Sequence, residues 1–119
     1  MARILVIDDD SDIAALVGLK LELDGHEVAM EADGIRGLER ARSDRPDIMI
    51  VDWTLPGLSG PEICAKVRAD ASLDSTWVIM LTARPLGVDG LEQTGADEVV
   101  AKPFSPRNLS ERVSAALDR

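Results

Sequence analysis

The chain has 119 residues, 45% of them hydrophobic and 29% charged, which predicts one globular domain over residues 1–119 and argues against intrinsic disorder. Its 13 basic and 22 acidic residues give a formal net charge of −9, so nucleic-acid phosphates and anionic membrane surfaces should repel it. We therefore expect no direct nucleic-acid binding and no membrane association.

The apolar runs and the cysteine content indicate in which cellular compartment the protein is found. The longest apolar runs have four or five residues, far below the ~20 that a membrane-spanning helix needs. Only four apolar residues separate Arg3 from Asp8, too few for the core of a signal peptide, and the single Cys64 cannot form an internal disulfide. We expect a protein of the reducing cytoplasm.

Five short runs of apolar and β-branched residues are spaced along the chain and predict five strands. Three of them show no alternation of polar and apolar residues, as expected of strands that are covered on both faces. The runs are residues 4–7, 27–30, 48–51, 77–81 and 98–101.

Stretches with apolar residues at helical spacing lie between and after these runs. Pro61 and Pro106 stand where the first residue of a helix is expected, and Ser105 is a candidate N-cap. Gly25 is placed to end the first helix. The apolar positions are Ile13, Leu16 and Val17, then Ile35 and Leu38, then Ile63 and Val67, and finally Leu109, Val113, Ala116 and Leu117.

The alternation of strands and helices implies right-handed βαβ units around a parallel sheet. The predicted fold class is α/β, a doubly wound (βα)5 sandwich of three layers with a five-stranded parallel sheet. In such sheets ligands bind beyond the carboxyl ends of the strands. The polar residues expected at that edge are Asp8, Asp9, Asp10, Asp52, Thr82 and Lys102.

These side chains form a candidate metal and phosphoryl site. Carboxylates about 5 Å apart repel by ~3 kcal/mol at an effective dielectric constant of 20, so several acids at one edge require a compensating cation. Oxygen ligands favour Mg²⁺, which commonly joins one or two carboxylates to a phosphoryl group. Lys102 and Thr82 could then hold phosphoryl oxygens, and Asp52, alone on its strand, is the candidate nucleophile.

A small phosphatase of the haloacid-dehalogenase type is a second interpretation of the acidic run. The motif of that family is Asp-x-Asp-x-Thr after the first strand, and Asp8 and Asp10 fit its two acids. Asp12 stands where the threonine belongs. Such an enzyme would turn over free phosphate esters and would need a general acid beyond the metal site.

The complete motif set resembles the receiver domain of two-component response regulators, the CheY-like superfamily, over essentially the whole chain. The resemblance implies the flavodoxin-like strand order 2-1-3-4-5. The segments that carry it are Ile4-Leu-Val-Ile-Asp-Asp-Asp10, Val51-Asp-Trp-Thr-Leu-Pro-Gly-Leu-Ser-Gly60, Leu81-Thr-Ala-Arg84, Gly95-Ala-Asp97 and Ala101-Lys-Pro-Phe104.

The resemblance also implies a role for each residue of the site. Asp52 would be the phosphoacceptor, and Thr82 and Lys102 would sense the phosphoryl group. The peptide bond between Lys102 and Pro103 is expected to be cis. Thr54 and Arg84 match positions that tune the dephosphorylation rate. The implied Mg²⁺ ligands are Asp9, Asp52, the backbone carbonyl of Thr54 and Asp8, which would bind directly or through water.

The implied function is a phosphorylation-dependent signalling switch. A partner histidine kinase or histidine phosphotransfer protein would donate the phosphoryl group. The domain would catalyse only its own phosphorylation and dephosphorylation, so we do not expect an enzyme in the usual sense. Its output face would regulate a downstream protein or effector domain, by direct contact or through a phosphorylation-dependent dimer.

Two features depart from the family pattern. Val99 occupies the position of the usual switch aromatic, and the stretch from Thr82 to Lys102 is shorter than usual, which would trim the fourth helix or the loop before it. Both changes fall on the usual output face. They leave open an alternative, a protein-interaction module that keeps the receiver fold while its switching is atypical or lost.

Overall fold

The elements follow the predicted alternation of strands and helices. The structure is a computed structural model and describes residues 2–83 and 95–118. The expected α/β class and strand order are confirmed, since five parallel strands pair in the order β2-β1-β3-β4-β5. The elements are β1 (Arg3–Ile7), α1 (Ser11–Leu23), β2 (Glu27–Glu31), α2 (Gly34–Asp44), β3 (Ile48–Asp52), α3 (Gly60–Arg68), the short 3-10 helix η1 (Ala71–Leu73), β4 (Trp77–Thr82), β5 (Glu98–Ala101) and α5 (Pro106–Leu117).

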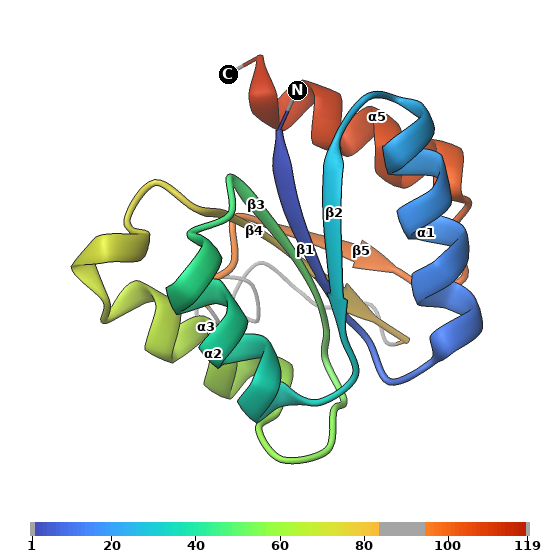
Figure 1. The fold of residues 1–119 in the computed structure, drawn as a ribbon. Coiled ribbons are helices and arrows are strands. Elements are labelled where there is room, and N and C mark those ends of the chain that lie inside the picture. The colour runs from blue at the N-terminus through green and yellow to red at the C-terminus, as the bar shows by residue number, and fades with distance from the viewer. Residues whose placement is uncertain (1, 84–94, 119) are drawn as a thin grey trace.

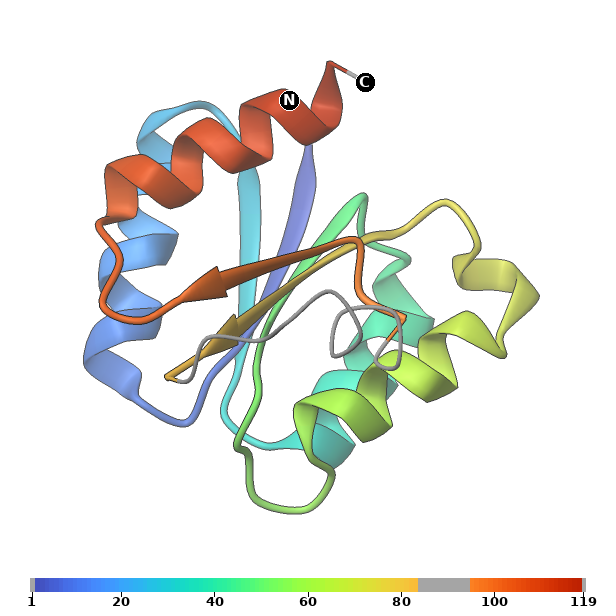
Figure 2. The ribbon, with the colours of Figure 1, turned by 180° about the vertical axis from the view of Figure 1, so that it is seen from behind.

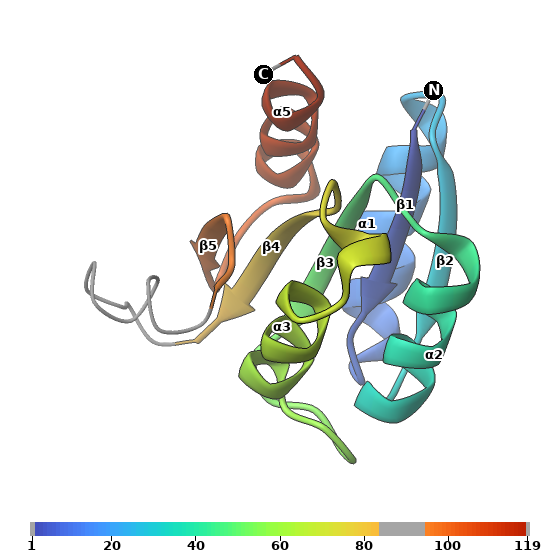
Figure 3. The ribbon, with the colours of Figure 1, turned by 90° about the vertical axis from the view of Figure 1, so that its left-hand side faces the viewer.

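The sheet separates two helical layers. Helices α1 and α5 cover one face, and α2 and α3 cover the other (Figure 1 and, from the side, Figure 3). Successive residues of a strand point to opposite faces. On β1, therefore, Ile4 and Val6 join the α1/α5 core, whereas Leu5 and Ile7 join the α2/α3 core. Both faces are apolar, which is why this strand reads as an uninterrupted hydrophobic run.

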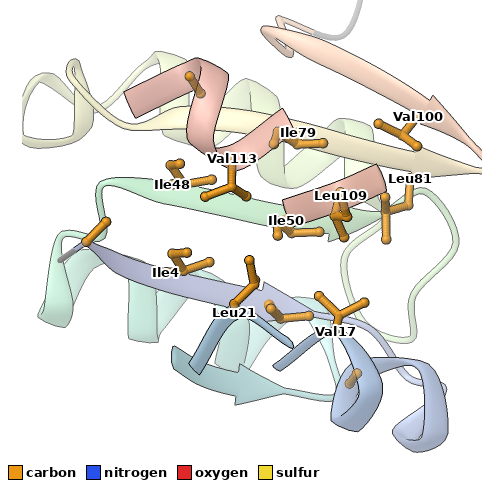
Figure 4. Close-up of a cluster of buried hydrophobic side chains, with 14 residues drawn as sticks. Ile4, Val17, Leu21, Ile48, Ile50, Ile79, Leu81, Val100, Leu109 and Val113 are labelled. Atoms are coloured by element: carbon orange, nitrogen blue, oxygen red, sulfur yellow. The ribbon is translucent and has the colours of Figure 1, made fainter. Parts of the chain in front are cut away.

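The α1/α5 core anchors these two helices to the sheet. Figure 4 shows Val17 and Leu21 of α1 and Leu109 and Val113 of α5 directed at the sheet residues, and all four are buried. Full burial of such a side chain contributes about 1.5–3 kcal/mol. Because these contacts span β1, β3 and β4, they hold the three central strands in fixed register beneath the carboxyl edge.

The order of the strands explains why the central strands are buried and the edge strands are partly exposed. All five residues of β3 are buried, whereas β2, at one edge, has exposed or half-buried residues throughout. At the other edge, β5 carries one buried residue, Val100. The view from behind in Figure 2 looks onto this β5 side of the molecule. Functional groups at the ends of the central strands therefore start from a rigid base.

Local helix signals place most of the helix boundaries as predicted. Ser105 caps α5 by accepting the backbone N–H of Asn108 at 3.0 Å, and Pro106 is the first residue of that helix. Gly25 follows α1 with a φ of 96°, a left-handed conformation that glycine adopts without a steric penalty.

The start of α3 differs by one residue from the expectation. Ser59 and Glu62 form a capping box, in which each side chain accepts the backbone N–H of the other residue. The helix therefore begins at Gly60, and Pro61 is its second residue.

Three residues of the predicted apolar stripes do not enter the core. Leu16, Ile35 and Leu117 are 58%, 52% and 38% exposed. Adjacent residues of a helix are turned by about 100°. With Val17 and Ala116 buried against the sheet, their neighbours Leu16 and Leu117 are left on the outer side of their helices.

Some expectations fall on residues outside those that the structure describes. They include Arg84 and the stretch expected to carry the shortened fourth helix, because residues 84–94 are not described. Among the helices in residues 2–83 and 95–118, none is long and apolar enough to cross a membrane.

The packing of α2 against β1 gives a test of core density. A Cβ on Gly37 would lie 2.5 Å from Cδ1 and 2.9 Å from Cγ1 of the fully buried Ile7. Alanine is the better helix former by about 1 kcal/mol, but overpacking a dense core costs about 1–3 kcal/mol. We expect Gly37→Ala to lower the free energy of unfolding by up to about 2 kcal/mol in urea denaturation. A higher value than that of the wild type would contradict this packing.

Candidate functional site

The carboxyl edge of the sheet gathers the residues singled out in the sequence. Asp8 and Asp9 directly follow β1, Asp52 ends β3, Thr82 ends β4 and Lys102 follows β5. The parallel register brings these strand ends side by side. A pocket of about 560 Å³ opens there, lined by Asp9, Asp52, Trp53, Thr54, Thr82, Ala83 and Lys102.

Three carboxylates gather at this pocket, and two of them, Asp9 and Asp52, line it. Asp8, Asp9 and Asp52 each offer one oxygen, and these three oxygens lie within 4.8 Å of one another. Asp8 and Asp52 are buried, and Asp9 is exposed. Oδ1 of Asp8 accepts the backbone N–H of Asp10 at 2.9 Å, whereas the buried Oδ2 has no hydrogen-bond partner among the described residues.

Lys102 lies against this acid cluster from the β5 side. Its Nζ is 3.1 Å from Oδ2 of Asp52 and 3.8 Å from Oδ2 of Asp8. One ammonium facing three carboxylates leaves a formal charge of −2 at the pocket. Two of the three acids are buried, so solvent screens this charge poorly.

The residues of the pocket fit a magnesium ion. Mg²⁺ is a hard cation that takes oxygen ligands and is bound through one or two carboxylates together with water and phosphate. The orphaned Oδ2 of Asp8 is a buried acceptor that a cation would satisfy. Thr54 lines the same pocket, next but one to Asp52.

Burial raises the pKa of Asp8 to about 6. The N–H of Asp10 opposes this rise, and the negative charge of Asp52 adds to it. A positive charge beside this carboxyl would stabilise its ionised form and lower its pKa. The same group will bind a metal less well below pH 6, where a proton competes with the ion.

The ends of β4 and β5 are joined on the opposite side of the pocket. The backbone N–H of Lys102 donates to the carbonyl of Thr82 at 2.7 Å, and Thr82 is 4% exposed. The peptide bond between Lys102 and Pro103 is cis, as expected. The hydrogen bond links the backbone of Thr82 to the backbone that carries Lys102.

The third acid of the run has a structural task. The Asp10 side chain caps α1 by accepting the backbone N–H groups of Asp12 and Ile13, at 3.1 and 3.2 Å. A phosphatase of the type considered above would use Asp10 as its second acid. Its engagement at the start of the helix argues against that interpretation.

The sequence did not reveal what supports the loop between β3 and α3. The carbonyl of Trp53 accepts the N–H of Gly60 at 2.9 Å, and a Cβ on Gly60 would lie 2.5 Å from the carbonyl oxygen of Asp52. Gly34 approaches the same loop, at Leu58. The sequence did contain one indication of these close contacts. Each of the two helices begins with a glycine, Gly34 or Gly60, although helix formation does not require glycine there.

Known proteins resemble this chain in sequence. The sequence matches the profile of the family described as response regulator receiver domain over residues 4–114. It is 41% identical over 120 residues to the DNA-binding response regulator MtrA of Mycobacterium tuberculosis (strain ATCC 25618 / H37Rv), covering 98% of this chain and 51% of that protein. The chain thus spans about half the length of the curated relatives it matches.

Solved structures are similar over nearly the whole chain. The chemotaxis response regulator CheY4 of Vibrio cholerae has a TM-score of 0.89 and 30% identity, with 98% of each chain covered. The receiver domain of the sensor histidine kinase PA1611 from Pseudomonas aeruginosa PAO1 has a TM-score of 0.89 and 28% identity, covering 99% of this chain and 98% of that one. That structure contains a magnesium ion coordinated in the active site cleft.

The raised pKa of Asp8 predicts a pH-dependent effect of Asp8→Asn on stability. Without metal, ionising Asp8 in the folded state opposes folding, because its folded pKa of about 6 exceeds the ordinary value of 3.8. The stability that the protonated group contributes is complete below about pH 4 and is lost as the pH rises through about 6. We expect Asp8→Asn to match the wild type near pH 4 and to be more stable by on the order of 2–3 kcal/mol at pH 7.

Urea denaturation in the presence of a chelator, repeated across this pH range, measures the difference. Added Mg²⁺ should shrink it at pH 7, because the wild-type site binds the ion more tightly. A difference that does not change with pH would show that Asp8 is ionised at little cost.

Proposed function

The chain belongs to the family of response regulator receiver domains of two-component systems, and we propose that Asp52 is its phosphoacceptor. One observation supports the assignment above all: Asp52 lines an open pocket, with Lys102 at 3.1 Å and the carboxylates of Asp8 and Asp9 close by. We also propose that residues 1–119 form one receiver domain. Its chemistry is its own phosphorylation and dephosphorylation, without turnover of other substrates.

Phosphorylation exchanges one bond to phosphorus for another. A carboxylate oxygen of Asp52 bonds to the phosphorus atom as the bond between phosphorus and the donor's histidine nitrogen breaks. The leaving imidazole keeps the electron pair of that bond and is neutral, because its other ring nitrogen carries a proton. The phosphoryl group is thus transferred without a net change in protons.

Asp8, Asp9, Asp52 and the backbone carbonyl of Thr54 are the residues that would hold Mg²⁺. Bound there, the ion would supply positive charge that offsets the repulsion between the acid cluster and the phosphoryl oxygens. The magnesium ion in the active site cleft of the similar Pseudomonas receiver domain supports this choice.

Lys102 and Thr82 hold the phosphoryl group once it is on Asp52. The ammonium of Lys102 then pairs with a phosphoryl oxygen in addition to the carboxylate, and the Thr82 hydroxyl donates a hydrogen bond to another. Because the two backbones are joined by the 2.7 Å hydrogen bond, the ends of β4 and β5 move together.

A change at the phosphorylation site would be passed to α5 without an aromatic residue at the position of Val99. Val99 is partly buried against the α2/α3 core, whereas Val100, next to it, is buried against α5. We propose that displacement of β5 shifts α5 through Val100 and through Phe104, which also packs on the α1/α5 core. The altered face then binds a downstream protein or effector domain, or a second copy of the domain.

The alternatives are not favoured. The family match and the gathered site residues support a switching receiver over an interaction module that has lost switching. Some curated relatives are named DNA-binding response regulators. With a net charge of −9, this domain is proposed to act on an effector and not on nucleic acid directly.

The phosphodonor is proposed to be a histidine kinase or a histidine phosphotransfer protein in the cytoplasm, and a groove beside the site offers it a surface. The groove has a volume of about 390 Å³ and is lined by Ile13, Leu16, Val17, Lys102, Pro103, Phe104 and Pro106. Lys102 lines both this groove and the pocket of Asp52. A donor helix seated in the groove would therefore bring its histidine to the mouth of the pocket.

The phosphoacceptor is tested with acetyl phosphate and Mg²⁺. We expect the wild type to gain the mass of one phosphoryl group and Asp52→Asn to gain none, because an amide is not a nucleophile at this position. Asp74→Asn, which changes an exposed aspartate before the amino end of β4, should behave like the wild type. Phosphorylation of Asp52→Asn to the same extent would overturn the assignment.

The donor groove is tested with two leucines of α1. We expect Leu16→Ala to slow phosphotransfer from a histidine kinase that phosphorylates the wild type by about fivefold, the cost of one lost apolar contact of ~1 kcal/mol. Leu23→Ala, which alters a more exposed leucine that does not line the groove, should leave the rate unchanged. Acetyl phosphate should phosphorylate all three proteins equally, and a loss there would mean that Leu16 acts on the site itself.

A further inference from the structure

The loop that carries Thr54 is held at two points by glycines. At its far end, the N–H of Gly60 donates to the carbonyl of Trp53 at 2.9 Å. Nearer its middle, the N–H of Gly34 donates to the carbonyl of Pro56 at 3.0 Å. Figure 1 shows that the start of α2 and this loop lie at the same end of the sheet.

The contact between Gly34 and the loop leaves no room for a side chain. A Cβ on Gly34 would lie 2.2 Å from the carbonyl oxygen of Leu58 and 2.8 Å from its Cβ. The obstructing atoms belong mainly to the backbone, so they can yield only if the loop itself moves. Leu58 is four residues from Thr54, and no helix or strand between them absorbs such a movement.

The next residue of α2 supports the loop from the side. Gly57 has a φ of 84°, and a Cβ on it would lie 3.2 Å from Cγ1 of Ile35. Ile35 is 52% exposed, and it lies beside the loop and outside both cores. The first two residues of α2 thus bear on three consecutive residues of the loop, Pro56, Gly57 and Leu58.

We propose that Gly34 is a positioning residue for the metal side of the site: the close approach of its backbone sets the path of the loop and so the place of the Thr54 carbonyl relative to the carboxylates. The inference rests on the proposed function, because it assumes that this carbonyl is a Mg²⁺ ligand. Supporting groups of this kind commonly alter metal affinity by about 10–100-fold when they are changed.

The test compares the Mg²⁺ affinity of three variants with that of the wild type. Titration with MgCl2 is followed by tryptophan fluorescence, since Trp53 lines the pocket. We expect Gly34→Ala to weaken Mg²⁺ binding by about tenfold. We expect Ile35→Ala, which removes support without creating a clash, to weaken it by about two- to threefold.

Gly25→Ala is the control for general destabilisation. Gly25 also has a positive φ, so alanine is strained there, but no atom lies within 4 Å of the added Cβ. It lies at the amino-end edge of the sheet, opposite the site, and should lower the unfolding midpoint without changing the Mg²⁺ affinity.

Phosphorylation by acetyl phosphate separates positioning from a merely structural role. In Gly34→Ala, the Mg²⁺ concentration for half-maximal rate should rise by about tenfold, while the rate at saturating Mg²⁺ returns close to that of the wild type. Unchanged affinity in Gly34→Ala, or losses that only follow the unfolding midpoint in all variants, would overturn the proposal. If Gly34→Ala does not fold, Ile35→Ala decides by the same criteria.

The Mg²⁺ titration and the phosphorylation assay distinguish a failure of the proposed function from a failure of the role of Gly34. A wild type that neither binds Mg²⁺ nor takes up a phosphoryl group would refute the proposed function. A wild type that does both, while Gly34→Ala and Ile35→Ala bind Mg²⁺ equally well, would refute only the role of Gly34.

Discussion

Repulsion among three carboxylates at one edge of the sheet is the constraint around which the molecule is arranged. Asp8 and Asp52 are buried there and face a single ammonium, that of Lys102. Folding without a cation must overcome this charge, and the apolar contacts on both faces of the central strands are what overcome it. The stored repulsion is also what makes the site responsive, because any added cation or phosphoryl group changes the local balance.

Much of this arrangement could be predicted because it depends on local patterns. Short apolar runs predicted the five strands to within one residue at each end, and parallel strands necessarily bring Asp8, Asp52 and Lys102 to one edge. Burial could not be predicted, since Asp8 and Asp9 are neighbours in sequence and only the former is enclosed. The outward turn of Leu16 and the contact of Gly34 with Leu58 likewise depend on where other elements lie.

The acids of the first loop divide their tasks by position. Asp8 and Asp9 form a cluster of carboxylates with Asp52, whereas Asp10 caps α1. The cap fixes the start of that helix directly beside the site, so the same three residues set both the charge of the pocket and the position of the groove at Leu16. The short segment from Asp8 to Asp10 thus links the acid cluster to the groove beside it.

The alternation of side chains along β1 has a consequence for how such a domain can diversify. Ile4 and Val6 belong to the core under α1 and α5, and Leu5 and Ile7 belong to the core under α2 and α3, so one strand thickness separates the two. The donor groove lies on the first side, and the loop that carries Thr54 is supported from the second. Substitutions at distant sites that share no contacts combine almost additively. Residues that line the groove alone, such as Leu16, can therefore vary between duplicated domains, whereas Lys102, which lines both the groove and the pocket, is not free to change with the partner.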